Sequence, residues 1–172
     1  QKKGEKNGRH RNKGARKGLI WNDAKVLIKS ATDADSTANW TWIKGVAEFA
    51  PPSQADNTVE LPYINQDDRI TAKVKGTRAG GDISGTINAR FDGGAAETDA
   101  SLKGLQAAID AYNDPTGEYS IKWLWEDLGV YALVERAIIT DCSVQGGSLD
   151  TVVSYSLAAT CNSKVKYFEV GA

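Results

Sequence analysis

Apolar and polar residues alternate along two segments in the middle of the chain, as they do in β-strands with one buried side and one solvent-facing side. The first segment is 68–76, whose polar side is formed by Thr71, Lys73 and Lys75. The second is 82–91, whose polar side is formed by Ser84, Thr86, Asn88 and Arg90. A Gly-rich turn at 77–81 joins them, so we expect these two strands to pair as a hairpin.

Further apolar runs predict the remaining strands. We expect them at 24–29, at 40–49 with an interruption at Gly45, at 119–125, at 130–144, at 151–160 and at 165–170. The connection over 50–67 begins with Pro51 and Pro52, which lack backbone donors, and we expect it to be irregular throughout. A loop of this length inside a compact domain is often functional.

One segment has the spacing of an amphipathic helix. Its apolar positions are Leu102, Leu105, Ile109 and Tyr112. A capping residue is available at Thr98 or Asp99, and Pro115 ends the pattern, so we expect a helix near 99–113. Because this helix lies between segments expected to be hairpins, the predicted fold class is mostly β (α+β), with two packed antiparallel sheets, sandwich-like or barrel-like, and one flanking α-helix.

Charge is unevenly distributed along the 172 residues, although the net formal charge is only −1. Residues 1–18 contain eight Lys or Arg and one Glu, whereas the other 154 residues contain 13 Lys or Arg and 21 Asp or Glu. We expect 1–18 to be a basic flexible arm and 19–172 to be a single domain. The arm is either a solvated tail or a contact for nucleic acid or for an acidic surface on a neighbouring subunit.

The residue inventory argues against an enzyme. His10 is the single histidine and lies in the basic arm, so a Ser–His–Asp triad, a Cys–His pair and a His-based metal site all lack a held imidazole. The adjacent acids at 67–68 and 126–127 would point to opposite sides of a strand. We therefore expect no catalytic residue, no metal and no cofactor.

Cys142 and Cys161 are expected to be buried free thiols. If the strands at 130–144 and 151–160 turn at 145–149, the two sulfur atoms lie far apart along the sheet and out of disulfide reach. The longest segment without a charged side chain, 151–163, is shorter than a membrane-spanning helix requires, so we expect no membrane span.

A set of segments, taken in chain order, carries a family resemblance. They include Val74-Lys75-Gly76, Ile83-Ser84-Gly85-Thr86-Ile87, the helix at 102–109, the strands at 119–123 and 137–144, and the Gly-rich turn at 145–151. In this order, over about residues 20–160, the chain resembles the major tail (tail tube) proteins of long-tailed bacteriophages. In that family a helix follows the first hairpin, and a Gly-rich turn precedes the last long strand.

The resemblance implies a structural virion protein of the phage tail, made in the bacterial host cytoplasm. It implies a homo-oligomer of stacked hexameric rings, in which one four-stranded sheet from each subunit joins its neighbours around a lumen. DNA passes through this lumen during ejection without specific binding. Other tail proteins, such as the tape measure and the terminator, are the expected partners.

The resemblance also suggests which positions make contacts. We expect contacts between subunits or rings at Arg9, Arg11, Arg16, Lys17, Pro51, Pro52, Asp56 and Asn57. We expect positions that face the lumen or a neighbouring subunit at Thr71, Lys73, Lys75, Ser84, Thr86, Asn88 and Arg90. A net-negative lumen would let DNA slide, because each neutralised phosphate adds attraction. The cations among these positions do not fit a uniformly negative wall.

Other functions fit parts of the pattern. A basic arm ahead of a β-sandwich also occurs in capsid proteins of small icosahedral viruses, where the arm binds RNA. A secretion-system tube protein would share the tube-forming fold. A carbohydrate-binding β-sandwich would need exposed aromatic residues on one face, and Trp40 and Trp42 share a strand face.

Overall fold

The structure is a computed structural model that describes residues 18–61, 72–95 and 99–170. Its strands are β1 (Ala24–Ser30), β2 (Thr41–Ile43), β3 (Val46–Ala50), β4 (Asp56–Leu61), β5 (Ala72–Arg78), β6 (Asp82–Asn88), β7 (Tyr119–Trp125), β8 (Val130–Val144), β9 (Ser154–Cys161) and β10 (Lys166–Val170). The helices are α1 (Ala100–Asn113) and two short 3-10 helices, η1 (Trp21–Asp23) and η3 (Glu126–Leu128).

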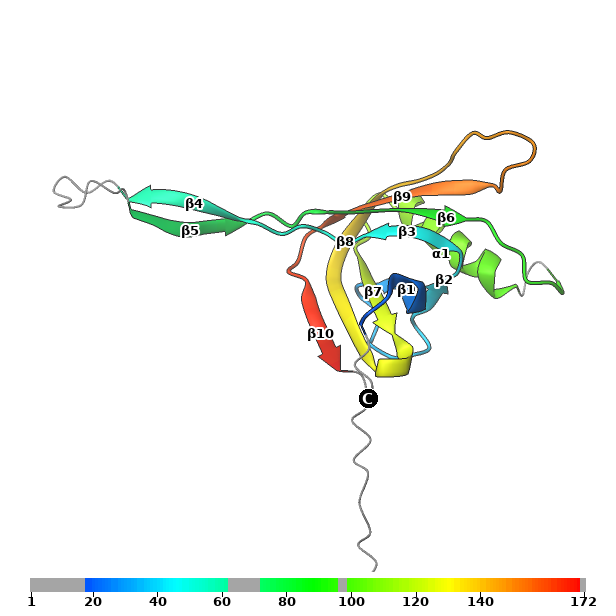
Figure 1. Cartoon of the computed structure of the whole chain (residues 1–172), viewed down its shortest axis with the longest axis horizontal. Coiled ribbons are helices and arrows are strands. Elements are labelled where there is room, and N and C mark those ends of the chain that lie inside the picture. Colours follow the sequence, from blue (N-terminus) through cyan, green and yellow to red (C-terminus); the bar gives the residue numbers. More distant parts are fainter. Residues whose placement is uncertain (1–17, 62–71, 96–98, 171–172) are drawn as a thin grey trace, which may run out of the picture.

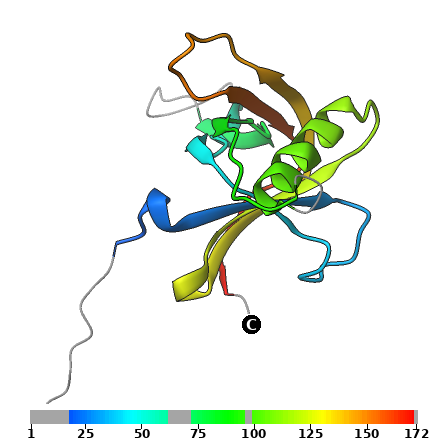
Figure 2. The ribbon, with the colours of Figure 1, turned by 90° about the vertical axis from the view of Figure 1, so that its right-hand side faces the viewer.

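Eight strands form one antiparallel sheet in the order β2-β1-β7-β8-β9-β6-β3, and β10 pairs with β8 beside this path. The Phe49 ring of β3 packs at a tilt against the Trp123 ring of β7, with ring centroids 5.3 Å apart, although three strands separate β3 and β7 in the sheet. The sheet therefore folds over on itself and encloses the core between its two halves. It remains open, because β2 and β3 do not pair with each other. Helix α1 packs against β2 and β8 (Figure 2).

Strand β8 belongs to both halves of the sheet. Its first half pairs with β7 up to Ala137, and its second half pairs with β9 from Ala137 to Val144. The register shifts once in each half, so β8 carries one extra residue opposite β7 and another opposite β9. Each extra residue is a β-bulge, which bends a strand and increases its twist. These two bulges lie where the sheet turns from one layer into the other.

Strands β4 and β5 form a separate two-stranded sheet, which we call the β4–β5 arm (Figure 1). It projects from the body, and its base is fixed by Gln54. The Gln54 amide donates hydrogen bonds to the backbone oxygens of Gly80, at 2.7 Å, and Ser163, at 2.9 Å. Its carbonyl oxygen accepts one from the backbone nitrogen of Val165, at 2.9 Å. One side chain thus joins both connections of the arm to the segment before β10.

The predicted fold class is confirmed as mostly β with one flanking helix. The helix and its N-cap are confirmed as well, because the Asp99 carboxylate accepts hydrogen bonds from the backbone nitrogens of Ser101 and Leu102. The buried face of α1 differs from the predicted one. It is formed by small residues and one leucine, whereas Tyr112 is exposed. The buried positions are Ser101, Gly104, Leu105, Ala108 and Ala111.

Two predictions about the middle of the chain are wrong. The strands predicted at 68–76 and 82–91 do not pair with each other, because β5 pairs with β4 whereas β6 pairs with β3 and β9. The connection over 50–67 is not irregular throughout, since Asp56–Leu61 is a strand. Gly81 explains part of the difference. Its φ of +71° turns the chain out of the arm and into the body, where the Gly81 oxygen accepts a hydrogen bond from Cys161.

Both cysteines are free and buried, as predicted. The strand register assumed for that prediction differs from the observed one, because the segment between β8 and β9 is longer than the predicted turn. Cys142 lies opposite Leu157, and Cys161 lies opposite Ala137. Burial raises the pKa of each thiol to about 11, with smaller contributions from Asp141 at Cys142 and from Asp82 at Cys161.

Candidate assembly surfaces

The half of the sheet formed by β3, β6, β9 and residues 138–144 of β8 contains no lysine or arginine. Ile83 and Ile87 of β6 point into the core, so the intervening side chains point outward. Strand register places their cross-strand neighbours on the same side. We call this surface the hydroxyl face: Glu48, Asp82, Ser84, Thr86, Asn88, Asp141, Ser143, Ser154, Ser156 and Thr160.

The hydroxyl face carries few charged side chains, and all of them are acidic. Its charged side chains are three carboxylates, and the Asp82 carboxylate accepts a hydrogen bond of 3.0 Å from Thr160 Oγ1. Most of the remaining side chains on the face are short and polar or, at Ala50 and Ala158, small and apolar. Ile138, opposite Thr160 and 41% exposed, is the large apolar side chain that the register places there. Such a surface presents hydroxyl groups to water and offers a phosphate no cation to bind.

The other half of the sheet carries the cations. Lys25 and Lys44 lie 4.3 and 4.8 Å from the Trp42 ring centroid. Lys122 lies 4.4 Å from the Trp40 ring, and burial lowers the pKa of this lysine. Trp40 is almost fully buried, so the two tryptophans do not form the exposed aromatic platform that a carbohydrate site needs. Charge is therefore divided between the two layers, with acids on one and lysine–tryptophan contacts on the other.

Both edges of the half-sheet with the hydroxyl face are open. β3 pairs with β6 only, and within the described residues its other edge has no strand partner. Among the residues that the structure describes, the second half of β8 pairs with β9 alone, because pairing with β7 ends at Ala137. Open strand edges expose unpaired backbone groups and are templates for pairing with another chain.

The β4–β5 arm has one apolar and one charged side. Val59 and Val74 lie opposite each other and are 51% and 44% exposed. On the charged side, Lys73 lies 3.4 Å from Glu60 and Lys75 lies 3.5 Å from Asp56. The Arg78 guanidinium holds the pKa of Asp56 below its usual range, chiefly through a hydrogen bond. An isolated two-stranded hairpin is marginally stable in water, and this one leaves two facing valines about half exposed.

The structure separates the candidate residues into distinct places. Asp56, Asn57, Lys73 and Lys75 lie in the β4–β5 arm, whereas Pro51 and Pro52 lie at its base, Pro52 being buried. Ser84, Thr86 and Asn88 lie on the hydroxyl face. Arg90 follows β6 and pairs with Asp92 at 2.7 Å, so it does not add a free cation to that face. Arg9, Arg11, Arg16, Lys17 and Thr71 lie outside the described residues.

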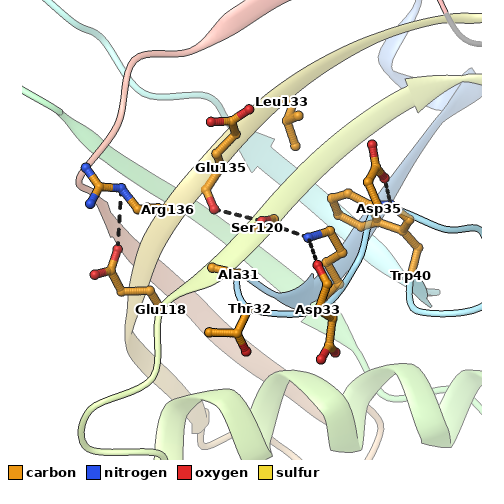
Figure 3. Close-up of a pocket in the computed structure, with 11 residues that line it drawn as sticks. Ala31, Thr32, Asp33, Asp35, Trp40, Glu118, Ser120, Leu133, Glu135 and Arg136 are labelled. Carbon is orange, nitrogen blue, oxygen red and sulfur yellow. Dashed lines mark hydrogen bonds and ion pairs between the residues drawn. The ribbon is translucent and has the colours of Figure 1, made fainter.

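A charged cleft, which sequence reasoning missed, opens at the far end of β1 from η1 (Figure 3). Its volume is about 440 Å³, and three parts of the chain line it: the end of β1 with the connection to β2, the start of β7 and the middle of β8. Glu135 and Arg136 line it together although they are adjacent in sequence. The first bulge of β8 explains this, because the extra residue interrupts the usual alternation of sides. The charged side chains of the cleft are Lys29, Asp33, Asp35, Glu118, Glu135 and Arg136.

Lys29 forms the floor of the charged cleft and is 9% exposed. Its ammonium donates hydrogen bonds to the backbone oxygens of Asp33, at 3.1 Å, and Ser30, at 3.3 Å. Ser120 Oγ, 3.5 Å from the same ammonium, donates to the Glu135 backbone oxygen at 2.7 Å. Lys29 is thus satisfied by the protein itself. Among the described residues, no group of three or more His, Cys, Asp or Glu is placed to hold a metal ion.

The fold is that of tube-forming proteins. No family model and no curated protein sequence matches the chain. Among solved structures, it matches a chain from the tail of an empty gene transfer agent (GTA) particle at C6 symmetry, with a TM-score of 0.56 and 16% identity over 88% of this chain and 100% of that one. Among the described residues, no helix combines the length and apolarity needed to cross a membrane.

Two more solved structures share this fold. The SPP1 tail tube protein matches with a TM-score of 0.54 and 15% identity, covering 89% of this chain and 81% of its own. A chain from the PVC sheath/tube terminator of an extracellular contractile injection system matches with a TM-score of 0.54 and 10% identity, covering 89% of this chain and 99% of its own. The chain therefore has the fold of tail tube proteins, with low sequence identity to each.

Proposed function

We propose that this protein is a structural subunit of a phage tail tube, and that its copies form hexameric rings that stack around a DNA conduit. The observation that carries the proposal is the hydroxyl face, a sheet surface without lysine or arginine that lies between two open strand edges. The fold shared with tail tube proteins supports it. We propose no catalytic role for the chain.

The open strand edges allow neighbouring copies to pair edge to edge and so to form a ring. The free edge of β3 in one copy pairs with the free edge of residues 138–144 of β8 in the next, which extends the half-sheet from subunit to subunit. Repetition of one head-to-tail contact closes a ring when the rotation per subunit fits. Closure also removes the exposed strand edges that would otherwise aggregate.

The hydroxyl face then lines the lumen. DNA carries one negative charge per about 1.7 Å of helix axis, and a wall with cations would hold it through counterion release. Glu48, Asp82 and Asp141 repel the phosphates, while the serine and threonine hydroxyls keep the wall hydrated. DNA can therefore slide through without a specific contact.

The β4–β5 arm connects one ring to the next. Its apolar side, with Val59 and Val74, is the surface to be covered, and Gln54 holds its base rigidly to the body. Asp56 and Asn57 lie on this arm, and Pro51 and Pro52 stiffen its base. Tape measure and terminator proteins would meet the tube within its lumen and at its end, and the mature location would be the virion.

Electron microscopy of the purified protein tests this function. We expect hollow tubes with a regular ring repeat, and a cryo-EM map with the hydroxyl face on the lumen. Closed shells would favour a capsid protein, and monodisperse monomers at high concentration would contradict both. A map with the hydroxyl face on the outer surface would contradict the lumen assignment while leaving the tube itself intact.

A charge test addresses the conduit directly. Thr86→Lys with Ser156→Lys places cations on the hydroxyl face, and we expect tubes of this variant to retain short duplex DNA in a nuclease-resistant form at low salt. Gln106→Lys, on the exposed side of α1, is the matched control. Equal amounts of nuclease-resistant DNA in tubes of the variant and of the control would contradict a hydroxyl face that lines the lumen.

A further inference from the structure

We propose that the charged cleft binds basic side chains from residues 1–17 of an adjacent copy of this chain. The site is the cleft of about 440 Å³ between the β1–β2 connection, β7 and β8. Its occupant is a lysine or arginine of the N-terminal segment. The two carry opposite charge, and the described chain begins at the opposite end of β1 from the cleft.

Carboxylates outnumber cations in the cleft by four to two. Both cations are engaged, since Lys29 donates to backbone oxygens and Arg136 donates to the Asn162 oxygen at 3.2 Å. Glu135 is engaged by Lys166, at 2.5 Å. The carboxylates of Asp33, Asp35 and Glu118 remain, and of these Asp35 accepts one hydrogen bond, from Trp40 Nε1 at 2.8 Å.

One carboxylate oxygen of Glu118 has no hydrogen-bond donor among the described residues. This atom, Oε2, is shielded from solvent. The Arg136 Nε lies 3.8 Å away, which is longer than the roughly 2.7–2.9 Å of a charge-assisted hydrogen bond. A shielded acceptor without a donor is costly, and the Glu118 side chain as a whole is 38% exposed, so a cation that meets the accessible part of this carboxylate would be stabilised.

The N-terminal segment is the part of the chain that matches this chemistry. Residues 1–18 contain eight Lys or Arg against a single Glu. The remaining residues carry a net excess of acids, so this segment has more to gain from an acidic partner than from its own surroundings. Arginine fits a carboxylate pair best, because its planar guanidinium donates along several directions at once.

The cleft and the start of the described chain lie at opposite ends of β1. The described chain begins beside η1, where Trp125 Nε1 donates to the Ile20 oxygen at 3.0 Å. The cleft lies beyond the other end of β1, at Ala31 and Thr32. Seven residues of β1 separate these ends by roughly 23 Å, at about 3.3 Å per residue. A segment of 17 residues can extend over more than this distance, so length alone does not select the copy. A head-to-tail ring favours the cleft of a neighbour, and the two-population cross-link separates it from the chain's own cleft.

The inference requires self-association but not a tube of any particular symmetry. It extends the proposed function, since a head-to-tail contact is what a ring repeats. A chain that associates into other assemblies and still shows the contact would contradict the tube and leave the cleft assignment standing.

Cross-linking between two differently tagged populations tests the contact. One carries Arg11→Cys and the other Asp33→Cys, and a short bis-maleimide is added after co-assembly. We expect a heterodimeric product whose yield falls as salt rises, because the contact is ionic. Gln106→Cys replaces Asp33→Cys as the control and should give little product. An equal yield with Gln106→Cys, or a product formed only within one chain, would overturn the proposal.

Charge variants provide an independent measure. Asp33→Asn with Glu118→Gln should raise the critical concentration for assembly about tenfold, the scale of one charge-assisted pair, while Asp150→Asn should leave it unchanged. Removal of residues 1–17 should raise it as well, and combining the two changes should add little. Thermal unfolding of the unassembled variants confirms that they fold. Fully additive effects, or no effect of the cleft variant, would overturn the proposal.

Discussion

The α-carbon of Gly104 in α1 faces the backbone oxygen of Trp42, and a side chain at Gly104 would overlap that oxygen. Helix α1 therefore approaches the end of β2 as closely as a backbone can. This contact fixes the helix on the sheet and explains why small residues, rather than the larger apolar ones, form its buried face.

Gly104→Ala should therefore destabilise the fold, although alanine is the better helix former by about 1 kcal/mol. The added methyl group must push α1 away from Trp42, and we expect a net loss of about 1–3 kcal/mol in the free energy of unfolding. Urea denaturation measures it. Lys103→Ala, one residue away on the exposed side, is the control, and an equal or greater stability of Gly104→Ala would show that the helix is free to shift.

Asp99→Ala should lower the unfolding free energy by about 2–4 kcal/mol, because it removes a helix cap and leaves a further backbone N–H, that of Asp92, without its acceptor. One carboxylate oxygen accepts from Ser101 and Leu102, and the other accepts from the Asp92 nitrogen at 2.8 Å. Asp99→Asn keeps an acceptor and should recover part of the loss. The matched control, Asp110→Ala on the exposed side of α1, should change stability by less than about 0.5 kcal/mol.

Cys142 and Cys161 should not react with a thiol reagent at pH 8 in the folded protein and should react fully after unfolding. Burial raises the pKa of each thiol from 9.0 to about 11, so the folded state resists ionisation. The unfolded thiols ionise at lower pH, and this contribution to stability is present below pH 9 and is lost as pH rises toward 11. Cys142→Ser with Cys161→Ser should weaken that alkaline loss, measured by thermal unfolding from pH 8 to pH 11. Rapid labelling at pH 8 would contradict the buried placement.

Val74→Ser should leave the unfolding free energy of the monomer within about 0.5 kcal/mol of the wild type, because the side chain is already half exposed. Tube assembly should be impaired, since the variant makes the apolar side of the β4–β5 arm polar. Light scattering over a concentration series measures assembly. Lys73→Gln, on the charged side of the same strand, should assemble much more like the wild type, and equal impairment of both would argue against an apolar contact.

Gln54→Ala should loosen the base of the β4–β5 arm. It removes hydrogen bonds to the Gly80 and Ser163 oxygens and from the Val165 nitrogen. We expect faster proteolysis of the arm, with little change in the cleavage of the body. Gln54→Glu keeps the acceptor for Val165 but places a carboxylate oxygen against the Gly80 and Ser163 oxygens, so its arm should be cleaved at least as fast as that of Gln54→Ala. An unchanged cleavage rate in Gln54→Ala would mean that strand pairing alone holds the arm.

Local sequence signals predicted elements well and their partners poorly. Asp99 and Pro115 mark the ends of α1, and the span of β8 was predicted to the residue. Alternation identifies β5 and β6 as strands, but it carries no information about which strand lies beside which. Strand β4 was missed because Asn57 and Glu60 have low strand propensity, and pairing with β5 overrides that preference.

The same distinction applies to the candidate surfaces, where residues on one strand could be predicted and their neighbours on other strands could not. Ser84, Thr86 and Asn88 were identified from their alternation, and each lies on the hydroxyl face. Its other members come from strands that are adjacent only in the folded sheet. The charged cleft had no sequence signal at all, since three separate elements form it and a bulge places Glu135 beside Arg136.

The two bulges of β8 also limit how this protein can change over evolution. The buried residues of β8 fall at 132 and 134, then at 137 and 139, and then at 142. Each interruption compensates for one extra residue, so losing a single residue between 130 and 144 would exchange core and surface positions downstream. Substitutions in β8 are therefore more readily accepted than insertions or deletions. The loop at 145–153 has no such constraint, and we expect variation in chain length among relatives to accumulate there.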